Sequence, residues 1–131
     1  MALTTQRTRY IAIFTIEDDI LDKACEMLGQ HLSESFGGVT IYSGEGCHGY
    51  WSENAHQYLN QYSANVHQEQ VIIVQLSVLP ELAQQALDVL QVTIAAICKD
   101  LNSSTRYVHV ESEPVTAHHF KLDHKKSKAG D

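Results

Sequence analysis

The order of elements along the sequence predicts an α+β domain with the ferredoxin-like βαββαβ plait. Apolar runs typical of strands alternate with two amphipathic helical patterns, and the two strand–helix–strand halves are similar in length. This order packs two helices on one face of an antiparallel sheet. We place the single domain at residues 9–120, between a flexible N-terminus (residues 1–8) and a flexible basic tail (residues 121–131).

The first half predicts a strand, a helix and a short strand. Residues 10–16 are apolar and rich in β-branched and aromatic side chains, which is typical of a central strand buried on both faces. Apolar residues then recur every three or four positions over 21–32, the stripe of an amphipathic helix. Gly37 and Gly38 end this helix, because glycine tolerates the left-handed cap. Residues 39–42 form the short strand.

The second half repeats this order after a polar excursion. Residues 52–69 are expected to hold at most a turn of helix, and residues 70–78 give the strongest strand signal of the chain. Pro80 suits the first turn of a second amphipathic helix, which ends at residues 102–104. Residues 106–111 alternate as a half-exposed strand. After Pro114, residues 115–120 either continue this strand or form an extra edge strand.

Composition and charge argue against several classes of function. Residues 1–120 hold five Lys and Arg against fourteen Asp and Glu, so this body repels a nucleic-acid backbone. No apolar run of about 18 residues predicts a membrane span, and the N-terminus lacks the order of a secretory signal. Three widely spaced cysteines do not form a disulfide framework. A cytoplasmic protein that binds neither nucleic acid nor membrane is expected.

The strands predict self-association. Ile11, Ile13 and Ile73 alternate with residues that are also apolar, so both faces of the sheet carry hydrophobic side chains. The two helices cover only one of these faces. An exposed apolar face needs a second cover, and a second copy of the chain supplies one. A homodimer is therefore expected.

One glycine-rich stretch resembles a known group of proteins. Phe36-Gly37-Gly38-Val39-Thr40 is followed by Gly44, Gly46 and Trp51, and Glu69 precedes the apolar strand. Over residues 9–120 this pattern resembles small uncharacterised bacterial ferredoxin-like domains. The resemblance implies the fold and no particular activity. The sequence departs from the group at residues 47–50, which are inserted before the tryptophan, and in the long polar stretch after it.

The same stretch holds the candidate ligand-binding residues. Backbone N–H groups of a glycine-rich loop can approach a small polar or anionic ligand, and a tryptophan can stack on a planar one. The stretch matches neither of the standard nucleotide-binding motifs, and the favoured interpretation is that its glycines allow a tight turn between strands. The candidate ligand-binding residues are Tyr42, Gly44, Glu45, His48, Tyr50 and Trp51.

Histidine is frequent, with eight residues, and suggests acid–base or metal chemistry. His48, Glu45 and His109 are the candidates for a catalytic acid or base, and alternation places His109 and Glu111 on one face of a strand. Cys47 is the candidate thiol nucleophile. No metal site or cofactor is expected, since the sequence has no closely spaced ligand pair of the kind that structural zinc uses.

These observations favour a binding, sensor or interaction domain that acts as a homodimer. The first alternative is a small enzyme that uses general acid–base chemistry on a small polar substrate. The second is a structural subunit of an assembly. The fold does not separate these classes of function, because the plait hosts all of them.

Overall fold

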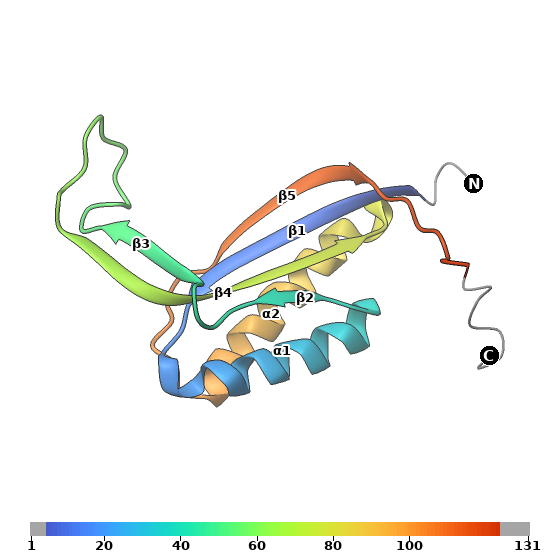
Figure 1. Cartoon of the computed structure of the whole chain (residues 1–131), viewed down its shortest axis with the longest axis horizontal. Coiled ribbons are helices and arrows are strands. Elements are labelled where there is room, and N and C mark those ends of the chain that lie inside the picture. Colours follow the sequence, from blue (N-terminus) through green and yellow to red (C-terminus); the bar gives the residue numbers. More distant parts are fainter. Residues whose placement is uncertain (1–4, 124–131) are drawn as a thin grey trace.

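The computed structural model describes residues 5–123. Two helices lie below a sheet whose strands run nearly parallel to them (Figure 1). The helices are α1 (Leu21–Phe36) and α2 (Ala83–Asp100), each preceded by a short 3-10 turn. The strands are β1 (Gln6–Thr15), β2 (Thr40–Tyr42), β3 (His48–Ser52), β4 (Val66–Val78) and β5 (His109–Thr116).

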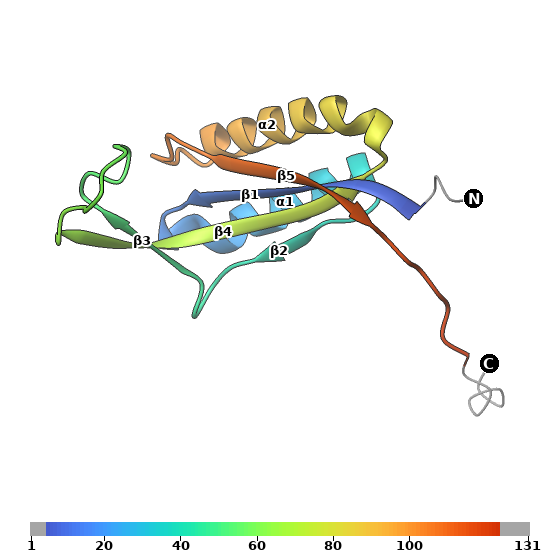
Figure 2. The same cartoon turned by 90° about the horizontal axis from the view of Figure 1, so that it is seen from above.

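The sheet is antiparallel and has the order β2-β4-β1-β5, with β3 also paired to β4. The two central strands of the plait are thus β4 and β1, and Figure 2 shows β5 at the edge beside α2. This confirms the predicted α+β plait with two helices on one face of an antiparallel sheet. Gly37, with a φ of 84°, caps α1 as predicted, and Pro80 opens the turn before α2.

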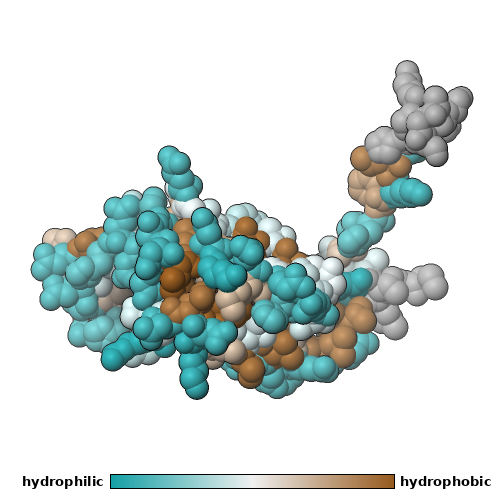
Figure 3. Space-filling model, turned by 90° about the horizontal axis from the view of Figure 1, so that it is seen from below, coloured by the Kyte–Doolittle hydropathy of each residue, from teal (hydrophilic) through white to brown (hydrophobic). Residues whose placement is uncertain are grey.

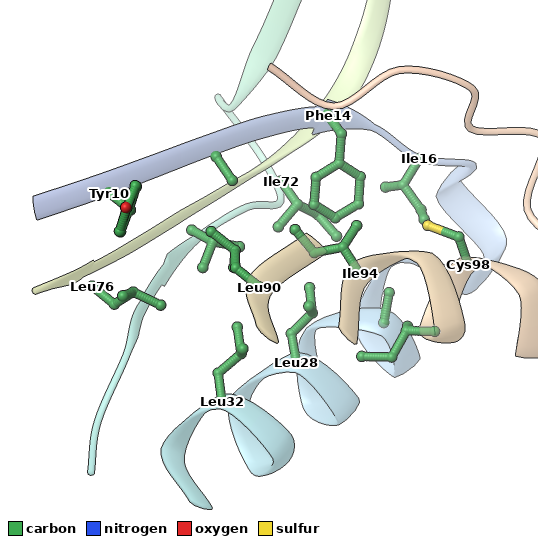
Figure 4. Close-up of a cluster of buried hydrophobic side chains, with 14 of the residues drawn as sticks. Tyr10, Phe14, Ile16, Leu28, Leu32, Ile72, Leu76, Leu90, Ile94 and Cys98 are labelled. Carbon is green, nitrogen blue, oxygen red and sulfur yellow. The ribbon is translucent and has the colours of Figure 1, made fainter. Parts of the chain in front are cut away.

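The core lies between the helices and one side of the sheet. Alternate residues of β1 and β4 are buried there, including Phe14 and Ile72. Figure 4 shows Leu28 and Leu90 directed from the two helices into this layer. The prediction that the first strand is buried on both faces is wrong, because its other side is only partly buried.

The polar excursion is a β-hairpin, which the sequence did not predict. β4 extends back to Val66 and pairs with the unpredicted strand β3, so the two form an arm that rises from the sheet on the side away from the helices (Figure 1). Side chains close its tip: Asn54 Oδ1 accepts hydrogen bonds from Ser52 Oγ at 3.1 Å and Ser63 N at 3.0 Å. Tyr62 Oη donates to the Gln57 carbonyl at 2.6 Å.

The edge strand β5 lies later in the chain than predicted. It pairs with β1 from His109 to Thr116, so residues 106–108 lie outside it. Pro114 does not interrupt the strand, because an edge strand can direct a missing N–H away from the ladder. Residues 117–120 form no extra strand. β1 starts at Gln6 because residues 6–8 pair with the end of β5. Residues 1–4 and 124–131, including most of the basic tail, lie outside the described part.

Candidate functional site

The glycine-rich stretch is a wide bulge in one edge of the sheet. β2 ends with Tyr42 opposite Ile73, and β3 resumes with His48 opposite Gln70. Five residues, 43–47, therefore stand opposite only two residues of β4. Within the bulge, Cys47 N donates to the Gly44 carbonyl at 3.0 Å. Gly44 and Gly46 both have a positive φ, which glycine adopts without strain.

The bulge separates the candidate ligand-binding residues rather than gathering them. Tyr42, which is 47% exposed, lies on the side of the sheet that faces away from the helices. Trp51 lies on the same side by alternation along β3 and β4, whereas His48 and Tyr50 lie on the opposite side of the arm. Cys25 Sγ donates to Ser43 Oγ at 3.1 Å and so joins the bulge to α1.

Trp51 folds back along β3 onto Gly49. A Cβ atom built on Gly49 would overlap the six-membered ring of the Trp51 indole. Only a glycine leaves room for this ring position, so a glycine at position 49 has a packing reason. Val71 of β4 lies on the same side of the arm as Trp51. It is only 3% exposed, although it does not belong to the main core cluster.

Gly49→Ala is expected to displace Trp51 from this position. The displaced indole enters water, and because Trp51 is the only tryptophan, its fluorescence maximum reports the change directly. We expect a red shift of the emission with little loss of global stability, since the arm lies outside the main core. Gly38→Ala is the matched control, because a Cβ there meets nothing within 4 Å. An unchanged spectrum in Gly49→Ala would contradict this packing.

The face of the sheet opposite the helices, here called the open face, has an apolar centre. Ile11, Ile13 and Ile73 lie there in adjacent positions on β1 and β4, partly exposed and outside the core cluster. One row across the sheet runs Tyr42, Ile73, Ile13 and His109. The predicted second apolar face therefore exists in the fold, and within residues 5–123 no helix covers it.

Polar pairs lie on the β5 side of the open face. His109 Nε2 and Glu111 Oε2 are 2.7 Å apart, which confirms that these two residues share a face. Both side chains are about two-thirds exposed, at 64% and 67%. Beside them, Arg9 forms an ion pair with Glu113. This corner encloses only a shallow hollow of about 100 Å³ lined by residues of β1 and β5.

The three catalytic candidates do not form one site. His48 is on β3, and β4 and β1 separate that strand from His109 on β5. Three strand spacings correspond to roughly 14 Å, too far for one group to transfer a proton directly to the other. Glu45 lies in the bulge between β2 and β3, at one edge of the sheet, whereas His109 lies on β5 at the opposite edge.

A polar cluster that the sequence did not reveal joins the segment before α1 to the segment after α2. Glu17 accepts hydrogen bonds from Ser103 Oγ at 2.6 Å and from Ser104 N at 2.7 Å. Thr105 Oγ1 donates to the Thr15 carbonyl at 2.6 Å. The hydrogen bonds from Ser103 and Ser104 lower the pKa of Glu17 from 4.5 to about 2. The only signal in the sequence is the run of hydroxyl residues after the second helix.

The part of the chain that the structure describes also lacks a metal-ligand cluster and a membrane-spanning helix. Among residues 5–123, no three His, Cys, Asp or Glu side chains are placed to share a metal ion. None of the helices there combines the length and the apolar character that a membrane crossing requires.

Comparisons with known proteins add little to this geometry. No protein-family model matches the sequence, and no curated protein matches it either. Among solved structures, the fold is similar to part of an amidase of the hydantoinase/carbamoylase family from Burkholderia multivorans, with 17% identity and a TM-score of 0.43. That match covers 86% of this chain but only 29% of the amidase chain. It is too distant to bear on function.

Proposed function

We propose that this chain is a cytoplasmic binding and interaction module that acts as a homodimer, with the open faces of two sheets packed against each other. The observation that carries the proposal is the partly exposed apolar centre formed by Ile11, Ile13 and Ile73. Packing a second sheet on these side chains removes them from water, which is the main driving force of association.

The size of the open face supports a second copy as the occupant. The face is formed by ten residues of β1, eight of β5, three of β2 and residues 71–78 of β4. At about 3.3 Å per residue and 4.8 Å per strand these give roughly 460 Å². The two strands of the arm, over the five residues of β3, add roughly 160 Å². The sum, roughly 620 Å² per copy, lies at the lower end of the roughly 600–1,000 Å² that each partner buries in a stable interface.

The charge of this face also supports self-association. The chain body is strongly acidic, so two copies repel each other over most of their surface. On the four paired strands, however, the open face carries two basic residues, Arg7 and Arg9, and two acidic residues, Glu111 and Glu113. The formal charge of these four strands on the open face is therefore zero, and Glu69 on the same side of the arm brings the whole face to −1. Because the open face is less acidic than the chain body as a whole, like-charge repulsion between two copies opposes association less there.

Light scattering after size-exclusion chromatography tests the proposal. At tens of micromolar we expect a mass near 29 kDa, twice the 14.7 kDa of one chain. Ile13→Lys places a charge at the centre of the interface and is expected to give the monomer. Circular dichroism should show a folded protein, because Ile13 lies outside the core cluster.

Val92→Lys is the matched control. Val92 is 68% exposed on α2, on the helix side of the molecule, so a lysine there should leave the dimer intact. Figure 3 shows this helix side, where hydrophobic side chains also gather between hydrophilic ones. A wild-type mass near 14.7 kDa, or dissociation by Val92→Lys but not by Ile13→Lys, would overturn the proposal. A much larger oligomer would favour a structural assembly subunit.

A further inference from the structure

One hollow lies away from the open face, between α2 and the start of β5. Its volume is about 390 Å³, at the small end of the roughly 300–1,000 Å³ typical of ligand sites. Its apolar surface comes from Leu90, Ile94 and Cys98 of α2, and from Val108 and Val110. The first three of these side chains are buried, at 8% exposure or less.

Two cationic residues are among those that line this hollow. Lys99 and Arg106 both line it, yet residues 1–120 contain only five Lys and Arg in total. Neither forms an ion pair with any residue in the range 5–123. In a body with fourteen acidic residues, two unpaired cations beside one apolar hollow favour a negatively charged occupant.

The other polar groups of the hollow are already engaged or neutral. Ser103 Oγ donates to Glu17, and Thr105 Oγ1 donates to a main-chain carbonyl, so neither hydroxyl hydrogen is free for a ligand. Burial, together with the negative charge of the nearby Glu17 carboxylate, raises the pKa of the Cys98 thiol and keeps it neutral and weakly polar. Glu17 is itself held by Ser103 and Ser104. Recognition of a charged group therefore falls to Lys99 and Arg106.

We propose that this hollow, here called the α2–β5 pocket, binds a small amphipathic carboxylate. The apolar body of the ligand lies on Leu90, Ile94 and Val108, and its carboxylate faces Lys99 and Arg106. A guanidinium and an ammonium are the natural donors to a carboxylate. The inference is independent of the proposed dimer, because the pocket is lined by α2 and by residues at the β5 edge rather than by the open face.

Amide NMR titration of the full chain tests the proposal, with octanoate as the probe. Octanoate is expected to bind with a Kd below about 1 mM, with shifts concentrated in residues 90–99 and 105–110. 1-Octanol and octylamine carry the same chain without the negative charge, and both are expected to bind at least tenfold more weakly. Absence of octanoate binding, equal binding of octylamine, or shifts confined to the open face would overturn the proposal.

Two variants assign the binding to this pocket. The double variant Lys99→Gln and Arg106→Gln is expected to raise the Kd for octanoate at least tenfold, whereas Lys23→Gln, on α1, should leave it unchanged. Ala95→Trp fills the pocket from an exposed position of α2 and is expected to abolish binding while the protein stays folded. Unchanged affinity in both pocket variants would show that octanoate binds elsewhere.

Discussion

Leu28→Ala is expected to lower the free energy of unfolding by about 3 kcal/mol, within the usual range of about 2–5 kcal/mol for buried Leu→Ala substitutions. Leu28 is 0% exposed and lies in the layer between α1 and the sheet (Figure 4). Removing its isobutyl group leaves a cavity that the closely packed neighbours Leu32 and Ile94 fill only in part. Urea denaturation followed by circular dichroism measures the change.

Val92→Ala serves as the comparison for this substitution. Val92 is also on a helix, but its 68% exposure means that little packing is lost. We expect a change within about 0.5 kcal/mol. Both variants and the wild type are compared at one protein concentration, since association would make the apparent stability depend on concentration. A loss below about 1 kcal/mol for Leu28→Ala would contradict the central position of this side chain.

Glu17→Gln is expected to destabilise the protein by about 1 kcal/mol at pH 7. The carboxylate of Glu17 joins the end of β1 to the segment after α2 through Ser103 and Ser104. Its pKa is about 2 in the folded protein, against 4.5 for an unperturbed glutamate. A pKa shift of this size corresponds to roughly 3 kcal/mol in the free energy of unfolding when the group is fully shielded from solvent. Glu17 is partly exposed, so solvent screening reduces the expected effect.

The effect depends on pH in a definite direction. A pKa that is lowered by folding stabilises the folded state above the unfolded pKa of 4.5, and this stabilisation is lost as the pH falls toward 2. The stability difference between wild type and Glu17→Gln should therefore be constant from pH 7 to about 5 and vanish near pH 2. Glu26→Gln, an exposed position on α1, should show no such trend. An equal pH dependence in both variants would contradict the role of Glu17.

The layers of the fold could be predicted from the sequence because their signals are local. The stripe of α1 and the apolar run of β4 need no knowledge of the rest of the chain, and Gly37 marks a helix end by its own conformational freedom. The limits of β5 could not be predicted in this way. Residues 106–108 alternate as a strand would, but pairing with β1 selects residues 109–116 instead.

The candidate site was less predictable, since it depends on register and on distant partners. The sequence predicts that the glycine-rich stretch gathers ligand-binding residues, yet the five-residue bulge changes the register between β2 and β3, and alternation along β3 directs Tyr50 and Trp51 to opposite sides. Glu17 and Ser103 are separated by 86 positions, so no local pattern reveals their contact. The pairing of His109 with Glu111, by contrast, follows from alternation alone.

The length of β4 has a consequence for the motions of the molecule. Residues 71–78 pair with β1, whereas residues 66–69 pair with β3 only. Between them, Gln70 pairs with His48 and also accepts a hydrogen bond from Ile16 N at 3.2 Å. The part of β4 that pairs with β1 belongs to the core of the domain, and we expect it to open only when the whole domain unfolds. The part that pairs with β3 alone is expected to open locally. The boundary between slow and fast fluctuation falls inside a continuous element, near Val71. The arm can thus detach and close again as a unit while the core beneath it stays intact.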